Sequence, residues 1–121
     1  MRRSMSDTIL ETAGKLTSGD RNKSYGHPLD DYECTGALFT ALLQHAGKLR
    51  QGAVIEPELA QALMIAVKLS RLSGNLTHRD SLIDIAGYAR TIEMTMVERT
   101  KRAATPENVA AKLTQSSDIS G

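Results

Sequence analysis

The chain has 121 residues, 40% of them hydrophobic, and a formal net charge of +1. This composition allows one modest core and excludes a strong global field, so we expect neither a membrane nor long nucleic acid as a partner. The one cysteine, Cys34, excludes an internal disulfide and a cysteine-cluster zinc site, and we expect it to be a small buried residue. No apolar h-region follows the basic start and no apolar run approaches about 18 residues, which predicts a cytoplasmic protein.

Two helices are predicted in the first half of the chain. The first covers about residues 8–17, because Thr8 and Glu11 have the spacing of a capping box ahead of an apolar stripe. Residues 17–28 form a polar loop. The second helix begins at Pro28, has acidic residues in its first turns, and runs to about Leu49, with Gly52 ending the region.

Two further helices follow, and strand signals are scarce. The third helix runs from Pro57 to about Leu72 and is apolar nearly all the way round, which predicts burial on most sides. The fourth begins at Asp80, or at Thr77 before it, and reaches about Arg99. We therefore predict an all-α protein with a single helical domain at residues 1–99. Residues 100–121 form a C-terminal extension with a short helix at about 106–113 and a loose tail.

The fourth helix carries a narrow polar stripe within a wide apolar arc. At about 100° per residue, Asp80, Asp84, Tyr88 and Thr91 share one side of this helix. Such a stripe on a sandwiched helix predicts a cleft. The alternative is that the stripe faces solvent and that Asp80 stabilises the start of the helix.

The carboxylates of this stripe are candidate metal ligands. Mg²⁺ prefers oxygen ligands, and Asp80 and Asp84, one turn apart, could share an ion with Glu33 of the second helix. Acidic pairs at this spacing are also common on solvated faces, and helix-dipole stabilisation explains Asp30 and Glu33 at least as well.

Two basic residues lie in the most apolar helix. Lys68 and Arg71 are one turn apart, and a cation in such a helix must reach solvent, pair with a carboxylate, or bind an anion. Pairing with Asp80 or Asp84 and binding of a phosphate group are nearly equal alternatives.

The loop between the first two helices supplies further candidate ligand contacts. Arg21 could contact a phosphate, and Tyr25, next to Gly26, could stack on a base. The alternative, slightly favoured, is an ordered connector in which Tyr25 fills the end of the bundle. His27 and His78 are expected at the surface.

The chain resembles a small all-α domain of unknown function that is common in bacteriophage and prophage genomes. Three segments carry the resemblance: GDRNKSYGHPLDDYE, KLSRL and HRDSLIDIAGYA. The resemblance covers about residues 9–95. That domain is in turn similar to MazG-like nucleoside triphosphate pyrophosphatases and to phage domains associated with nucleotide modification. This similarity implies a four-helix core bundle, Mg²⁺ held by carboxylates from two helices, and release of pyrophosphate from a nucleoside triphosphate.

Two functional hypotheses follow. In the first, the protein is an enzyme in the cytoplasm of a bacterial host. In this hypothesis, Mg²⁺ is held by Glu33, Asp80 and Asp84. The charge of the leaving pyrophosphate is neutralised by Lys68, Arg71 and Arg21. The base or sugar is contacted by Tyr25 or Tyr88. In the second, it is a non-catalytic phage factor that binds a nucleotide signal or a host protein in counter-defence. A third, structural interpretation treats the polar stripe as an ion-pair network.

The small core and the apolar third helix also predict a homo-oligomer. We expect a dimer with the fourth helix, or its Met-bearing end, in the interface.

Overall fold

The computed structural model describes residues 7–19, 26–107 and 113. These residues form four α-helices and no strand: α1 (Ile9–Leu16), α3 (Pro28–His45), α4 (Pro57–Gly74) and α5 (Arg79–Ala103). The predicted all-α class is confirmed. None of the described helices is both long and apolar enough to cross a membrane.

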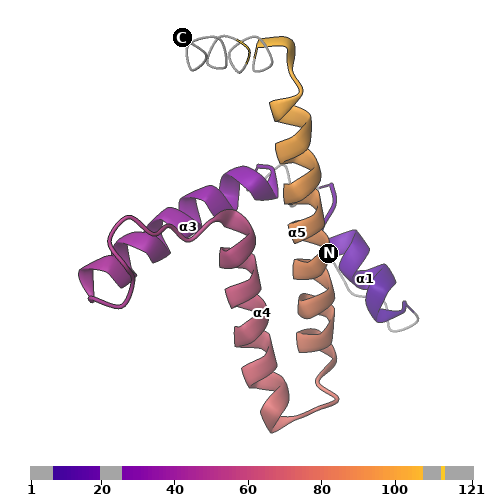
Figure 1. Ribbon diagram of the computed structural model, residues 1–121. Coiled ribbons are helices and arrows are strands. Elements are labelled where there is room, and N and C mark those ends of the chain that lie inside the picture. Colours follow the sequence, from indigo (N-terminus) through magenta and orange to yellow (C-terminus); the bar gives the residue numbers. More distant parts are fainter. Residues whose placement is uncertain (1–6, 20–25, 108–112, 114–121) are drawn as a thin grey trace.

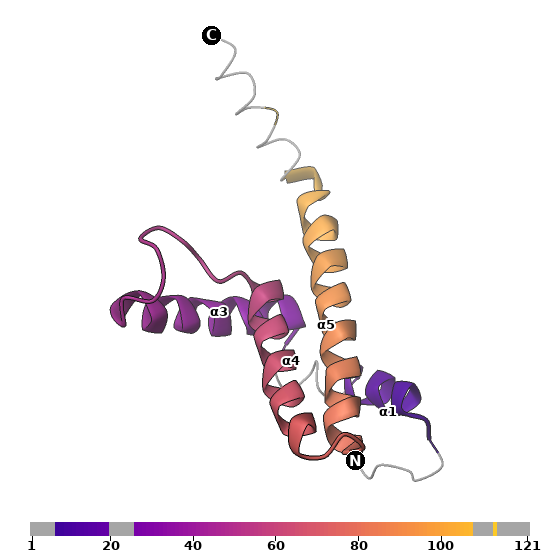
Figure 2. The ribbon, with the colours of Figure 1, turned by 60° about the horizontal axis from the view of Figure 1, so that its bottom comes forward.

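The helices are arranged around an antiparallel hairpin of α4 and α5 (Figure 1). α1 packs against α5 on the side away from α4, and the N-terminal part of α3 lies against both hairpin helices. The rest of α3 projects away from the hairpin in both ribbon views (Figure 2). Among the described residues, one long face of α4 is therefore left without a neighbouring helix.

The helix starts agree closely with the sequence predictions. The Thr8 side chain accepts a hydrogen bond from the Glu11 N–H at 3.1 Å and so caps α1. Proline occupies the first position of α3 and of α4, as predicted. α5 begins at Arg79, where the His78 ring caps the helix by accepting a hydrogen bond from the Ser81 N–H at 3.3 Å.

The helix ends differ more from the predictions. α3 ends at His45 and not at Leu49, because Gly47 adopts φ +70° and the Lys48 N–H turns back to the Leu43 carbonyl at 2.8 Å. Leu49 then packs against the core. α5 continues beyond Arg99 to Ala103. The predicted helix at about 106–113 falls largely outside the described residues, as does the predicted loose tail.

The central core lies where α3 meets the hairpin. Tyr32, Ile55 and Ala60 are buried there, and the ring of Tyr88 meets that of Tyr32 edge to face, with centroids 6.4 Å apart. Ile83 is buried on another part of α5. Such a small core accounts for the several large apolar side chains that stay exposed.

Two predictions about burial are wrong. Cys34 is exposed, because it lies on the side of α3 away from buried Tyr32. α4 is not buried on most sides: Leu59, Leu63 and Val67 keep 37%, 39% and 42% of their surface. α5 and α3 cover part of α4, and none of the other described helices packs extensively against the rest.

The crossing of α3 and the segment before α4 depends on Gly36. A Cβ at residue 36 would overlap the carbonyl oxygen of Ile55, which is backbone and cannot easily move. We expect Gly36→Ala to lower the free energy of unfolding by about 1–3 kcal/mol, measured by chemical denaturation. The control is Gly14→Ala in α1, where nothing lies within 4 Å of the added carbon. It should be neutral or stabilising, and equal effects of the two changes would contradict this account.

Candidate functional site

Three side-chain pairs fix how α4 and α5 lie along one another. Gln61 Nε2 donates to Thr95 Oγ1 at 3.0 Å, and both residues are fully buried. Lys68 Nζ lies 3.1 Å from Asp84 Oδ2, and Arg99 donates to Glu58 at 2.7 Å. These contacts place the C-terminal half of α4 beside the N-terminal half of α5, where most of the predicted site residues are found.

The Lys68–Asp84 ion pair is the centre of the candidate site. The Lys68 side chain keeps 13% of its surface and that of Asp84 keeps 31%, so the ammonium is largely desolvated while the carboxylate reaches solvent. Of the alternatives that the sequence left open, pairing between a basic residue of α4 and Asp84 is thus confirmed for Lys68. A partly buried pair of this kind is screened by salt less than a surface pair is.

Arg71 and Asp80 extend the site by one helical turn. Arg71 follows Lys68 on α4, and Asp80 precedes Asp84 on α5, so the antiparallel register brings their turns to the same end of the hairpin. Both residues are exposed. Arg71 is therefore not a buried cation, and loss of Asp84 would not strand it away from water.

The polar stripe of α5 runs from the surface into the core. Asp80 is exposed, Asp84 is partly exposed, and Thr91 is buried, with its hydroxyl donating to the Tyr88 carbonyl at 3.1 Å. Tyr88 packs on Tyr32 and so has a structural role beside its predicted role in ligand contact. The predicted continuous stripe along a cleft is therefore wrong for Thr91, which keeps 3% of its surface.

The three predicted metal ligands do not form a ready-made cluster. Glu33 is exposed on α3. In the part of the chain that the structure describes, no group of three or more His, Cys, Asp and Glu side chains could hold a metal ion. Asp80 and Asp84 remain a pair of carboxylates one turn apart, which fits an ion that brings other oxygen ligands with it.

Arg21 and Tyr25 lie outside the described residues. Thr17 and His27, which precede and follow these residues in the chain, both lie against α5. The Thr17 methyl group packs at Gly87, where an added Cβ would be 3.5 Å away. His27 lies 4.0 Å from Glu98.

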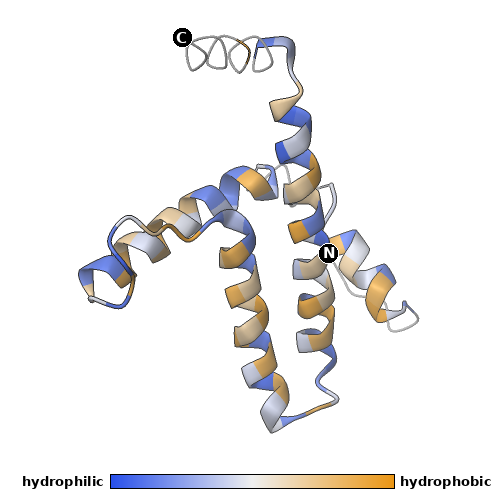
Figure 3. Cartoon of the chain, viewed as in Figure 1, coloured by the Kyte–Doolittle hydropathy of each residue, from blue (hydrophilic) through white to orange (hydrophobic). Residues whose placement is uncertain are grey.

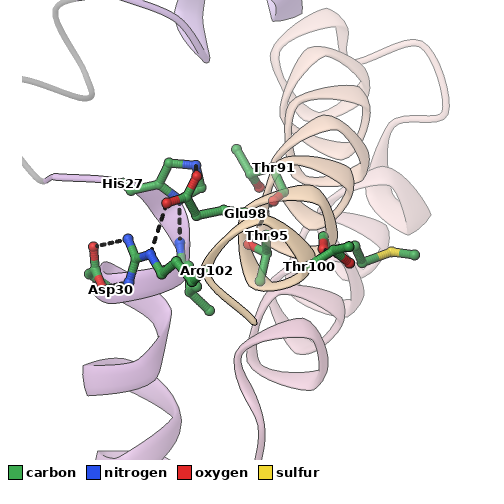
Figure 4. Close-up of polar contacts among 9 residues, drawn as sticks. His27, Asp30, Thr91, Thr95, Glu98, Thr100 and Arg102 are labelled. Atoms are coloured by element: carbon green, nitrogen blue, oxygen red, sulfur yellow. Dashed lines mark hydrogen bonds and ion pairs between the residues drawn. The ribbon is translucent and has the colours of Figure 1, made fainter. Parts of the chain in front are cut away.

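Sequence reasoning missed an ion-pair cluster that joins the start of α3 to the end of α5. Arg102 donates to both carboxylate oxygens of Asp30, at 2.7 and 2.9 Å, and to Glu98 at 2.8 Å (Figure 4). His27 lies beside this cluster and is partly exposed, and its ring accepts a hydrogen bond from the Leu29 N–H at 3.1 Å. We call Asp30, Glu98 and Arg102 the Arg102 clamp.

The clamp holds its carboxylates in the charged form. Hydrogen bonds from Arg102 lower the pKa of Asp30 and that of Glu98. The i to i+4 spacing of Glu98 and Arg102 was visible in the sequence, but Asp30 lies 72 residues from Arg102 and no pattern links the two.

The chain belongs to the family described as a domain of unknown function (DUF6378), whose model matches residues 8–96. It is similar to the Gene 55 protein of Mycobacterium phage D29, with 39% identity over 89 residues that cover 74% of this chain and 54% of the relative. It is also similar to the Gene 55 protein of Mycobacterium phage L5, with 30% identity over 95 residues that cover 78% and 56%. The chain thus spans about half the length of these relatives. No solved structure matches the chain.

These matches confirm that this is a small domain of unknown function of the phage type. Its predicted similarity to MazG-like pyrophosphatases stays a prediction.

The unequal burial of Lys68 and Asp84 gives a direct test of their pairing. Asp84→Asn leaves the largely buried ammonium without its counter-charge, so we expect a loss of about 1–3 kcal/mol in unfolding free energy. Lys68→Met leaves the more exposed carboxylate, which water can solvate, and should cost less than about 1 kcal/mol. The double variant should recover most of the loss in a double-mutant cycle. Strictly additive effects would contradict the contact.

The Arg102 clamp predicts a pH-dependent contribution to stability. The pKa values of Asp30 and Glu98 are lower in the folded chain than the ordinary 3.8 and 4.5, so their contribution is complete above those values and is lost as pH falls through the lowered pKa. We expect Arg102→Gln to lower the melting temperature at neutral pH and to have little effect well below pH 3.8. Arg90→Gln, also on α5, is the control. A difference between wild type and Arg102→Gln that stays constant with pH would be inconsistent with the clamp.

Proposed function

We propose that this phage-type domain binds a nucleotide, or a nucleotide-like small molecule with phosphate groups, where Lys68 of α4 meets Asp84 of α5. The observation that carries the proposal is their ion pair at 3.1 Å, in which the ammonium is largely desolvated and the carboxylate is partly open to solvent. A charge held in this way interacts with a ligand more strongly than a fully solvated lysine does.

The basic residues of α4 supply the phosphate contacts. Lys68 offers a compact positive charge, and exposed Arg71, one turn further, offers a planar guanidinium that can bind two phosphate oxygens at once. Together they fit a chain of phosphates that lies along the end of the hairpin. Arg21 and Tyr25, outside the described residues, are proposed to add a phosphate contact and a base contact, and Tyr88 a contact to the sugar or base.

The acidic residues of α5 suit a magnesium ion that arrives with the nucleotide. Mg²⁺ is commonly bound by one or two protein carboxylates together with phosphate oxygens and water. Asp84 and Asp80 would provide these carboxylates, with Glu33 as a more distant candidate. A bound magnesium nucleotide would also replace the ion pair without stranding either charge, because Lys68 gains phosphate and Asp84 gains the cation.

This arrangement supports hydrolysis of a nucleoside triphosphate to the monophosphate and pyrophosphate. When bound, Mg²⁺ would polarise the phosphoryl group and help to orient water. The chain's own contribution would be to hold the phosphates through Lys68 and Arg71 and to neutralise the charge that develops on the departing pyrophosphate.

A second candidate is a non-catalytic phage factor that binds a nucleotide signal or a host protein. Two observations favour it: the described residues contain no preformed group of three metal ligands, and one long face of α4 is exposed and apolar. Nucleotide binding that survives chelation of Mg²⁺, without product release, would favour this candidate over the enzyme.

Titration calorimetry with the common nucleoside triphosphates, with and without Mg²⁺, tests the proposal. We expect Lys68→Met to weaken binding by at least about tenfold, which is 1.4 kcal/mol. Lys48→Met removes the same charge from the exposed turn after α3 and should leave binding unchanged. Asp84→Asn should reduce the Mg²⁺-dependent part of binding, and its control is Glu93→Gln on the exposed side of α5.

Analysis of the products in the same samples separates the two candidates. Release of pyrophosphate that requires Mg²⁺ supports the enzyme. Absence of binding to every nucleotide by the folded wild-type protein would reject both nucleotide-binding candidates.

A further inference from the structure

The face of α4 that points away from α5 has the composition of a buried surface. Ten residues of this helix are exposed, and Arg71 is the one charged residue among them. The others are Leu, Val, Ala, Ser and Gly. An exposed helix face normally carries charged and polar residues, so this face is not adapted to water.

α5 of the same chain shows what a solvated helix face looks like. Its exposed positions include Arg90, Glu93, Arg99 and Lys101. In Figure 3, where colour follows the hydropathy of each residue, hydrophobic colour recurs along much of α4, and hydrophilic colour alternates with it in the last turns of α5. Large apolar side chains are also exposed on the other helices, among them Leu38 of α3 and Val97 of α5. What distinguishes α4 from α5 is that Arg71 is the one charged residue among its exposed positions.

The outer face of α4 has a shape that matches a copy of itself. Leu59, Leu63 and Val67 form a ridge at four-residue spacing, and Ala62, Ala66 and Ser70 form a parallel row of small side chains beside it. In helix packing, a ridge at this spacing fits into the groove between the equivalent ridges of another helix. The ridge can fill the small-residue row of a second copy while the second copy does the same in return, which is the condition for a two-fold interface.

The large apolar side chains of the outer face are the surface that such an interface would bury. Leu59, Leu63, Val67 and Leu69 keep 37%, 39%, 42% and 53% of their surface. A standard interface buries about 800 Å² on each partner. The outer face of α4 carries one charged side chain, Arg71, so two copies that meet there bring few like charges together.

We propose that two copies of the chain associate through the outer face of α4, with the Leu59–Leu63–Val67 ridge of one copy seated on the Ala62–Ala66–Ser70 row of the other. This interface differs from the expected one, which lay on α5. It does not use the Lys68–Asp84 pair of the proposed nucleotide site, because Lys68 lies on the side of α4 that faces α5. Arg71 follows Val67 by one turn and so borders both surfaces. The dimer covers the three exposed side chains of the ridge that the single fold leaves in water.

Sedimentation equilibrium of the full chain and of Ala66→Glu tests the interface. We expect the wild type to have twice the chain mass, and we expect Ala66→Glu to raise the dimer dissociation constant more than about 100-fold because it buries a charge. The matched control is Ala89→Glu at an exposed position of α5, which should remain dimeric. A wild type that is monomeric at all concentrations, or an Ala66→Glu variant that remains dimeric, would overturn the proposal.

A cysteine at the centre of the row keeps the proposal testable if Ala66→Glu fails to fold. Cys34 is exposed, so the experiment uses Ala66→Cys in a Cys34→Ser background. Oxidised glutathione should convert this variant to a disulfide-linked dimer, because the two copies of residue 66 lie beside the two-fold axis. Ala89→Cys in the same background should remain unlinked. Equal linking of both variants, or none at residue 66, would overturn the assignment of the face.

Discussion

The antiparallel contact of α4 and α5 is the constraint from which the rest of the molecule follows, and its register is specified by a buried polar pair. Gln61 and Thr95 are fully buried, and the Gln61 amide donates both to Thr95 and to the Pro57 carbonyl. A shift of one helix along the other would break the buried hydrogen bond between Gln61 and Thr95 and leave each side chain with its intrahelical partner alone, which costs about 0.5–1.5 kcal/mol. The register that avoids this cost also brings Lys68 to Asp84 and Arg99 to Glu58.

α1 and α3 add to the hairpin on two sides and leave a third side of α4 open. α3 is fixed at its start by the Arg102 clamp and at its middle by the close approach of Gly36 to Ile55. Because the core is small, the described helices leave the outer face of α4 exposed. The two proposed roles of α4 therefore use opposite sides of one helix: the inner side carries Lys68 to the candidate site, and the outer side joins a second copy.

The sequence predicted the helices better than it predicted their surroundings. Local signals such as the Thr8 cap and the prolines before α3 and α4 act within one or two turns, so they place helix starts reliably. The end of α3 was misplaced because two glycines, Gly47 and Gly52, both have positive φ, and only the fold shows which one ends the helix. The exposure of Cys34 and of the α4 face depends on which helices are neighbours, which periodicity cannot supply.

The candidate site was predictable in part for the same reason. Helical spacing identified Lys68, Arg71, Asp80 and Asp84 as residues of interest, and the antiparallel hairpin then brought Lys68 and Asp84 into contact. Spacing could not show that Thr91 of the same stripe is buried or that Glu33 belongs to no described group of metal ligands. It also could not reveal the pairing of Asp30 with Arg102, because these residues are 72 positions apart in the sequence.

The central claim is that phosphate binds where Lys68 and Asp84 meet. It is tested most directly by an NMR titration of the isotopically labelled chain with a nucleoside triphosphate and Mg²⁺, following the backbone amides and the Asp84 side-chain carboxyl carbon. The account predicts shifts concentrated in the second half of α4 and the first half of α5, with the Asp84 carboxyl among the most affected signals. Shifts confined to other parts of the chain, or none at saturating nucleotide, would contradict it.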